Sequence, residues 1–335
     1  MDSLTQIALG GAVGEATLGR RVGNRAAIWG MFCGTLPDLD MLVPLGDPVS
    51  DFTYHRSASH SFLVLALVTP LVVWLIMRFH PGTRAHRRGW ALLVYLVLAT
   101  HVLLDCFTVY GTQPFWPLGG APIGFATIFI IDPLYTVPLL AGLLTAVFLR
   151  RTRRRAWAWN VLGLAVSTLY LAWSVGASYR VEAVARASLE REGVACERLL
   201  VTPAPFNTLL WRVLAMDGDG YHEGVYSFLD ARAEVDFARY RHFPELLAGL
   251  EDHPPVWRLA WFTKGFYSVT RQGHAVVMTD LRMGMEPDYV FGFRVGTIGN
   301  PHARPSVPER VPGKVDWGRL PWLWERVWGR LRNSG

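Results

Sequence analysis

Residues 55–77 read "HRSASHSFLVLALVTPLVVWLIM", a polar cluster that runs directly into a long apolar segment. The apolar part fits the start of a helix that crosses a membrane, which takes about 20 such residues. Polar groups are costly at this boundary, because a charge without a partner near lipid costs several kcal/mol. The stretch therefore predicts a membrane span with a polar site at one end.

Other apolar segments extend this pattern through the first half of the chain. The chain has 335 residues, of which 51% are hydrophobic, and its mean hydropathy is +0.22. The runs that could span a bilayer are 61–79, 89–110, 133–149 and 157–178. Two earlier runs, 3–19 and 26–37, are rich in glycine and alanine, which suit close helix packing. We expect them to form a hairpin that turns at 19–25; two helices lying on the membrane surface are the alternative.

Arginines indicate how these helices are oriented. They cluster at alternate turns: Arg20, Arg21 and Arg25, then Arg78, Arg84, Arg87 and Arg88, then Arg150, Arg151, Arg153, Arg154 and Arg155. The intervening loops, 38–60 and 109–132, contain Arg56 alone. Arginine-rich turns stay in the cytoplasm by the positive-inside rule. We therefore expect a multi-pass protein of the bacterial inner membrane, with both loops and everything after residue 178 outside the cytoplasm.

The formal net charge of +6 does not indicate nucleic-acid binding. The arginines lie in short turns between apolar runs, and no nucleic-acid recognition motif accompanies them. The partner that this charge distribution predicts is the lipid bilayer.

The second half of the chain predicts an exported α+β domain that is rich in strands. Residues 179–193 are typical of a helix that leaves the membrane and ends at Gly193. "LLWRVLAMDGDGYHEGVYSFL" (209–229) predicts two strands joined by a turn at "DGDG". We expect a membrane domain over 1–178, the exported domain over 179–312 and a tail helix over 313–335. The Trp- and Arg-rich tail fits either a membrane interface or packing on its own domain.

Three polar clusters fall at the outer ends of the expected spans. They are "GTLPDLD", with Asp38 and Asp40; "HRSASHS", with His55 and His60; and "HVLLD", with His101 and Asp105. The orientation is derived from the arginines alone. That all three clusters fall at the outer ends of the spans is therefore an observation independent of it. Each cluster also has an ordinary structural interpretation, such as a helix cap, a salt bridge or a turn. Their agreement favours one shared site.

A divalent metal ion would account for these residue types. His101 and Asp105 are four residues apart and face one side of a helix, so both can bind one ion. His60 can approach from a second direction, and Asp38 or Asp40 from a third. Two imidazoles and two carboxylates suit Zn²⁺ best, with Mn²⁺ as the alternative.

The same motifs resemble a known family. "MDSLTQ", "LPDLD", "HRSASHS" and "HVLLD" with "YGTQPFWP", all within residues 1 to about 120, resemble the YdjM-type membrane-bound metal-dependent hydrolases. The order acid, His, His-x-x-x-Asp more distantly resembles the all-α zinc-dependent phospholipase C and nuclease superfamily. The resemblance implies one ion held by Asp38 or Asp40, His60, His101 and Asp105. Gln6 stands where many members of the family have histidine.

We also assign expected functions to the other polar residues near this ion. His55 is either a further metal ligand or a group that orients one. Arg56 could bind an anionic substrate oxygen in bidentate fashion, and Asp38 or Asp40 could take a proton from water.

We therefore expect a membrane-bound hydrolase. The resemblance implies that its substrate is a phosphoester or another lipid or envelope ester. A transporter is disfavoured, because the inner halves of the spans carry almost no polar residues. A scaffold with a structural metal and an exported domain that binds a partner protein is the main alternative.

Overall fold

The structure is a computed structural model that describes residues 1–148, 153–313 and 317–329. The chain divides into two compact units. The first, which we call the helical unit, comprises Met1–Val43 and Arg56–Val175; the second, the sheet unit, comprises Pro44–His55 and Gly176–Gly335. The short segment Pro44–His55 thus belongs with the C-terminal half of the chain. The predicted boundaries at 178/179 and 312/313 stay predictions.

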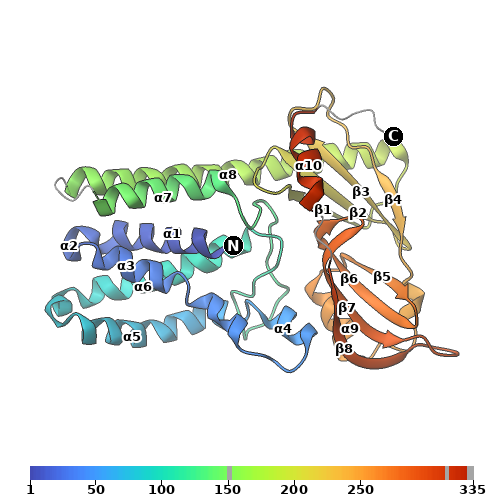
Figure 1. The fold of residues 1–335 in the computed structure, drawn as a ribbon, viewed down its shortest axis with the longest axis horizontal. Coiled ribbons are helices and arrows are strands. Elements are labelled where there is room, and N and C mark those ends of the chain that lie inside the picture. Colours follow the sequence, from blue (N-terminus) through green and yellow to red (C-terminus); the bar gives the residue numbers. More distant parts are fainter. Residues whose placement is uncertain (149–152, 314–316, 330–335) are drawn as a thin grey trace. The chain divides into compact units, whose positions relative to one another are not determined.

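The helical unit is a bundle of helices joined by turns and by one long loop, residues 107–132, between α6 and α7 (Figure 1). Its elements are α1 (Ser3–Gly14), η1 (Glu15–Gly19), α2 (Arg20–Val22), α3 (Arg25–Cys33), η2 (Pro37–Leu42), η3 (Ala58–His60), α5 (Phe62–Phe79), η4 (Pro81–His86), α6 (Arg87–Cys106), α7 (Pro133–Phe148) and the first part of α8 (Arg153–Glu192). Three stretches are long and apolar enough to cross a membrane: Phe62–Phe79, Pro81–Cys106 and Arg154–Glu192. The prediction of an N-terminal helical region with candidate membrane spans is confirmed. The expected span at 133–149 corresponds to α7, which is apolar but shorter than the three candidate spans, and residue 149 lies outside the described ranges.

The first two helices form the expected hairpin, with α1 packed directly on α3. Four glycines lie in this contact, at positions 10, 14, 30 and 34. A Cβ at Gly30 would overlap the carbonyl oxygen of Gly10, and one at Gly34 would lie 2.5 Å from the carbonyl oxygen of Gln6. The two backbones can approach this closely because glycine has no side chain. The hairpin, rather than a pair of surface helices, is therefore what the structure contains.

The interior of the bundle is apolar, and so is much of its outer surface. Trp90, Leu93 and Val94 on α6 are fully buried against neighbouring helices. On α5, Leu67 is 71% exposed, which in water would be unfavourable for so apolar a helix. In a bilayer this surface contacts acyl chains.

The sheet unit contains two antiparallel four-stranded sheets, each a simple meander (Figure 1). The first has the order β1 (Arg198–Pro203), β2 (Leu210–Met216), β3 (Gly220–Ser227), β4 (Ala238–Arg241); the second has β5 (Tyr267–Gln272), β6 (Ala275–Met285), β7 (Asp288–Thr297), β8 (Arg304–Pro312). The predicted turn at "DGDG" joins β2 to β3, where Met216 pairs with Tyr221. The strand-rich prediction is confirmed, and the described sheets are entirely antiparallel.

The second part of α8 belongs to the core of the sheet unit. Ala177, Val181 and Ala185 pack against the first sheet, beside Trp211 and Val213. The helix ends at Glu192, and Gly193 adopts a φ of +67°, as expected for a C-terminal glycine. The helix that leaves the bundle is thus held by a second hydrophobic core.

Buried charge connects the two sheets. Arg212 on β2 forms an ion pair with Glu223 on β3, and its Nη1 donates a hydrogen bond to the carbonyl oxygen of Leu281, at 2.8 Å. Both charged side chains are more than 90% buried. Removing one partner of such a pair leaves a buried charge uncompensated, so this contact fixes how the sheets pack.

Three short helices and a one-turn segment complete the sheet unit: α4 (Pro48–Tyr54), α9 (Pro254–Phe262), α10 (Leu320–Val327) and η6 (Pro244–Leu247). Phe52 on α4 packs against the rings of Phe262, Phe291 and Phe293, with centroid distances of 4.6–5.2 Å. This aromatic cluster explains why Pro44–His55 groups with residues so distant in sequence.

The tail helix α10, preceded by η7 (Trp317–Arg319), packs on its own domain, which was one of the two interpretations of the tail. Val327 is buried beside Ala204 and Leu210. Arg326 forms an ion pair with Asp230, and this contact fixes the same face. Parts of the expected tail, residues 314–316 and 330–335, lie outside the described residues.

Candidate metal centre

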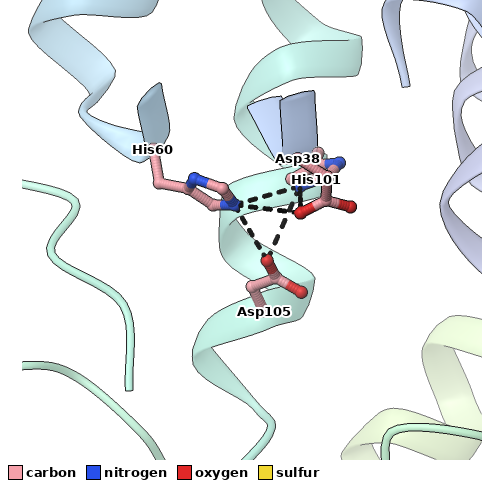
Figure 2. Close-up of side chains that lie close together, drawn as sticks. All are labelled: Asp38, His60, His101 and Asp105. Atoms are coloured by element: carbon pink, nitrogen blue, oxygen red, sulfur yellow. Dashed lines mark hydrogen bonds and ion pairs between the residues drawn. The ribbon is translucent and has the colours of Figure 1, made fainter. Parts of the chain in front are cut away.

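Four side chains converge at one end of the helical unit: Asp38, His60, His101 and Asp105 (Figure 2). Asp38 lies on η2 after α3, His60 ends η3 before α5, and His101 and Asp105 share the last turns of α6. Three separate segments thus contribute to one cluster. The four potential ligand atoms lie within 4.8 Å of one another. In the part of the chain that the structure describes, this is the one such group of three or more potential ligands.

Five of the six distances among the four ligand atoms are close to those around a tetrahedral ion. His60 Nε2 lies 3.2 Å from both His101 Nε2 and Asp105 Oδ2. Asp38 Oδ1 lies 3.5 Å from each imidazole Nε2, and His101 Nε2 lies 3.5 Å from Asp105 Oδ2. Ligands about 2.0–2.1 Å from an ion at the centre of a tetrahedron lie about 3.3–3.4 Å apart. The two imidazole nitrogens are therefore at zinc-site distances from each other and from both carboxylates, and the two carboxylate oxygens lie within 4.8 Å of each other.

Outer hydrogen bonds direct both imidazole lone pairs into the cluster. His101 Nδ1 lies 2.8 Å from the carbonyl oxygen of Gly34, which can only accept, so Nδ1 carries the proton. Ser59 Oγ donates to Asp40 Oδ2 at 2.6 Å and therefore accepts from His60 Nδ1 at 2.9 Å. In the neutral rings, each Nε2 is then an acceptor that faces the other Nε2 and two carboxylate oxygens. Four acceptors at this spacing need a cation or a proton among them.

The burial of the cluster makes its charges strongly coupled. His60, His101 and Asp105 are at most 1% exposed, and the Asp38 side chain is 19% exposed. Burial alone would raise the pKa of Asp38, but when no ion is bound and the imidazoles carry a proton on Nε2 as well, their hydrogen bonds outweigh burial and hold the pKa of Asp38 well below its ordinary value. Asp38 is therefore a carboxylate, the form that binds a metal.

Two cations lie behind Asp105. Arg56 Nε is 3.2 Å from Asp105 Oδ2, and the α-amino group of Met1 contacts Asp105 Oδ1. Burial, together with the charge of Arg56, lowers the pKa of the Met1 amino group. Three carboxylates, including that of Asp40, thus lie near one permanent cation, Arg56, and near an amino group whose charge burial disfavours.

Asp40 supports the cluster from outside the group of four. Its Oδ2 is 4.0 Å from His60 Nδ1, accepts from Ser59 Oγ and also accepts from the backbone N–H of Arg56 at 3.1 Å. Arg56 has a φ of +62°, which is strained for a side chain other than glycine. The hydrogen bonds from Arg56 N–H to Asp40 and from Gln113 N–H to the Arg56 carbonyl oxygen stabilise this conformation.

The structure thus brings together four of the six residues expected as ligands. Asp40 orients His60 through Ser59. His55 is outside the group: it ends α4, in the sheet unit, and its N–H donates to the carbonyl oxygen of Asp51. Arg56 is 6% exposed and donates to Thr108 Oγ1 at 3.1 Å, besides its ion pair with Asp105. Its expected role in binding substrate stays a prediction.

Other contributors have little or no signal in the sequence. Gln6 Nε2 donates to Asp105 Oδ1 at 3.1 Å and to the carbonyl oxygen of His101 at 3.3 Å. The carbonyl of Gly34 fixes the tautomer of His101, and backbone groups cannot be identified from residue type. The one hint in the sequence is the position of Gln6 in the first motif, where the resembled family often has histidine.

Comparison with known proteins agrees with this geometry. No solved structure matches the chain. Uncharacterized protein YfhP of Bacillus subtilis (strain 168) is 28% identical over 151 residues, which cover 43% of this chain and 45% of that protein. The chain therefore spans less than half the length of this curated relative. The family described as YdjM inner membrane protein matches residues 1–181, a range that contains all four clustered residues. Over this helical region, the chain belongs to the YdjM inner membrane protein family.

Proposed function

We propose that this protein is a membrane-bound, metal-dependent hydrolase that acts at the outer face of the inner membrane. The observation that carries the proposal is the convergence of four acceptor atoms within 4.8 Å of one another, with both imidazole Nδ1 protons directed outward. Two nitrogens and two oxygens at these distances favour Zn²⁺, with Mn²⁺ as the alternative.

The residues around the group support hydrolytic chemistry. A divalent ion held there would supply a water whose pKa is lowered towards 7. Asp40, on the same η2 turn as Asp38, has a side chain 21% exposed and can accept a proton as a general base. Arg56 keeps Asp105 ionised and in place through its ion pair. The substrate we propose is a phosphoester or another lipid or envelope ester, from the motif resemblance and the location.

One observation favours a second candidate, a scaffold with a structural metal. A structural zinc site is closed by four protein ligands, whereas a catalytic site keeps one position open. Here the cluster offers four donors, three of which are fully buried. Under this alternative, the metal fixes η2 and α6 to each other, and the sheet unit binds a partner protein.

Metal analysis followed by a phosphoester screen separates the two candidates. We expect one zinc per chain in detergent-purified protein and hydrolysis of bis(4-nitrophenyl) phosphate or of a phospholipid headgroup. Asp40→Asn should keep the zinc and lower the rate by about 10²–10⁴-fold, the usual contribution of a general base. Bound zinc with no hydrolysis of any phosphate ester, and a lower unfolding temperature after chelation, would support the scaffold instead.

The proposed orientation makes a separate prediction about topology. Because the arginine-rich turns mark the cytoplasmic side, residue 335 and loop 109–132 should both lie outside the cytoplasm. Alkaline phosphatase fused after residue 335 should be active, and the same fusion at Gly82, between arginine-rich segments, should be inactive. The reverse pattern of activities would show that the orientation is inverted.

A further inference from the structure

The approach to the metal centre lies along η2. Three of the four clustered side chains are at most 1% exposed, whereas Asp38 is 19% exposed and its neighbour Asp40 is 21% exposed. Both aspartates belong to η2, and Figure 2 draws Asp38 together with His60, His101 and Asp105. Among the described side chains of the site, these two are the ones that a substrate can reach first.

Pro37 of η2 is buried, whereas the remaining apolar side chains of η2 and the residue that follows it are exposed. Leu39 is 50% exposed, Met41 73%, Leu42 77% and the adjoining Val43 59%. We call these four residues the η2 rim. Large apolar side chains that are exposed so close together in the sequence are expected to form an apolar patch. Such patches are typical of a surface that contacts lipid or protein. The two aspartates and the rim thus share one short turn.

The rim continues the lipid-facing surface of the bundle. On α3, which directly precedes η2, Ile28 is 56% exposed and Phe32 is 49% exposed. No charged residue lies between Phe32 and Asp38 in the sequence. Since the protein belongs to an inner-membrane family, the exposed faces of its long apolar helices contact acyl chains. Exposed apolar side chains thus occur on both α3 and η2, with no charged residue in the sequence between Phe32 and Asp38.

A second segment at the same end of the bundle has the same character. Phe115 is 56% exposed and Leu118 is 82% exposed. Their loop is fixed beside the start of α5, because Ser61 Oγ donates to the carbonyl oxygen of Trp116 at 2.5 Å and Phe62 N–H donates to that of Pro114. Exposed aromatic and aliphatic residues next to a span are typical of the membrane interface.

We propose that the η2 rim inserts into the leaflet at this end of the bundle and that the metal centre takes its substrate sideways from that leaflet. The occupant of the rim is the acyl portion of a phospholipid, whose phosphoester then reaches Asp38 and Asp40 from the lipid side. The proposed insertion depends only on the exposure of the η2 rim and on the exposed apolar residues of the neighbouring α3. The identity of the substrate rests in addition on the proposed hydrolase function.

Nitroxide labels test the insertion without any activity measurement. Cys33, Cys106 and Cys196 are replaced by alanine, and single cysteines are introduced by Met41→Cys or Leu42→Cys in phosphatidylethanolamine–phosphatidylglycerol nanodiscs. Leu67→Cys on α5 is the control in lipid. Val307→Cys on β8, where Val307 is 78% exposed, is the control in water with exposure close to that of Leu42. Labels at 41 and 42 should relax with O₂ in preference to a water-soluble nickel chelate, as the Leu67 control does.

Other outcomes overturn the insertion. A label at 41 or 42 that behaves like the Val307 control would show that the rim faces water. A label shielded from both reagents would show that protein covers the rim. Should the cysteine variants fail to fold, wild-type protein can be photolabelled with a phospholipid that carries a diazirine in its acyl chain. Peptide mapping should then find the label within residues 39–43, and its absence there would reject the proposal.

A second arm tests the substrate class. Met41→Asp combined with Leu42→Asp places two charges on the rim, which is unfavourable at the membrane interface. The rate on a bilayer phospholipid, divided by the rate on bis(4-nitrophenyl) phosphate, should fall by about tenfold or more. An unchanged ratio would show that the substrate does not enter over the rim. If the wild-type protein hydrolyses neither ester, the hydrolase proposal fails, whereas the labelling result still decides the insertion.

Discussion

His101→Ala should reduce the bound metal from one ion per chain to less than one-tenth of an ion. His101 supplies one of the four converging donor atoms, and its Nε2 lies 3.2 Å from that of His60. Loss of a group that only orients a ligand typically lowers metal affinity by about 10–100-fold, so loss of a ligand itself should cost more. The measurement is metal content after dialysis against a weak chelator, by elemental analysis.

The matched control is His274→Ala. His274 is an exposed histidine in the turn between β5 and β6, in the sheet unit, so its removal should leave the metal content unchanged. Equal metal content in the wild-type protein and in both variants would show that the ion binds elsewhere. His101→Gln, which keeps a polar side chain, serves to separate loss of a ligand from loss of the fold.

Gly30→Ala should strongly destabilise the helical unit, although it adds only one methyl group. The new Cβ would overlap the backbone carbonyl oxygen of Gly10, so α1 and α3 would have to separate. Overpacking of a rigid site costs about 1–3 kcal/mol, and a clash with backbone falls at the upper end of that range or above it. We expect a large decrease in the unfolding temperature of the detergent-purified protein.

Gly176→Ala on α8 is the appropriate comparison, because nothing lies within 4 Å of a Cβ added there. Alanine favours a helix by up to about 1 kcal/mol over glycine, so this variant should be as stable as the wild type or more stable. Gly30→Ala should also weaken metal binding, since α3 leads into Gly34, whose carbonyl oxygen accepts from His101. Identical unfolding temperatures for both variants would contradict the close contact of α1 and α3.

The clustered residues could be predicted from the sequence because polar residues are rare beside lipid-facing apolar segments. His60, His101 and Asp105 each stand beside an apolar run, and the spacing of the last two places them on one face of α6. The choice between Asp38 and Asp40 could not be made, because both belong to the same short turn. Their difference is one of direction: Asp38 faces His101, whereas Asp40 bonds to Ser59.

The fold was predictable where the signal is local. Hydropathy indicated the helices, and the "DGDG" turn indicated the β2–β3 hairpin. The position of Pro44–His55 was not predictable, because it depends on Phe52 meeting Phe262, Phe291 and Phe293. A single aromatic residue such as Phe52 gives no indication in the sequence of which distant residues it will contact. The packing of the tail likewise depended on Val327, a residue that fitted both interpretations.

The membership of Pro44–His55 in the sheet unit also has a consequence for the order of biosynthesis. Phe52 emerges from the ribosome about 200 residues before Phe262, which at 5–20 residues per second is a delay of about 10–40 s. During that time α4 has no aromatic partners, although the helices on either side of it can already insert. The sheet unit is therefore the last part of the molecule to fold, and it needs a segment that was synthesised among the first.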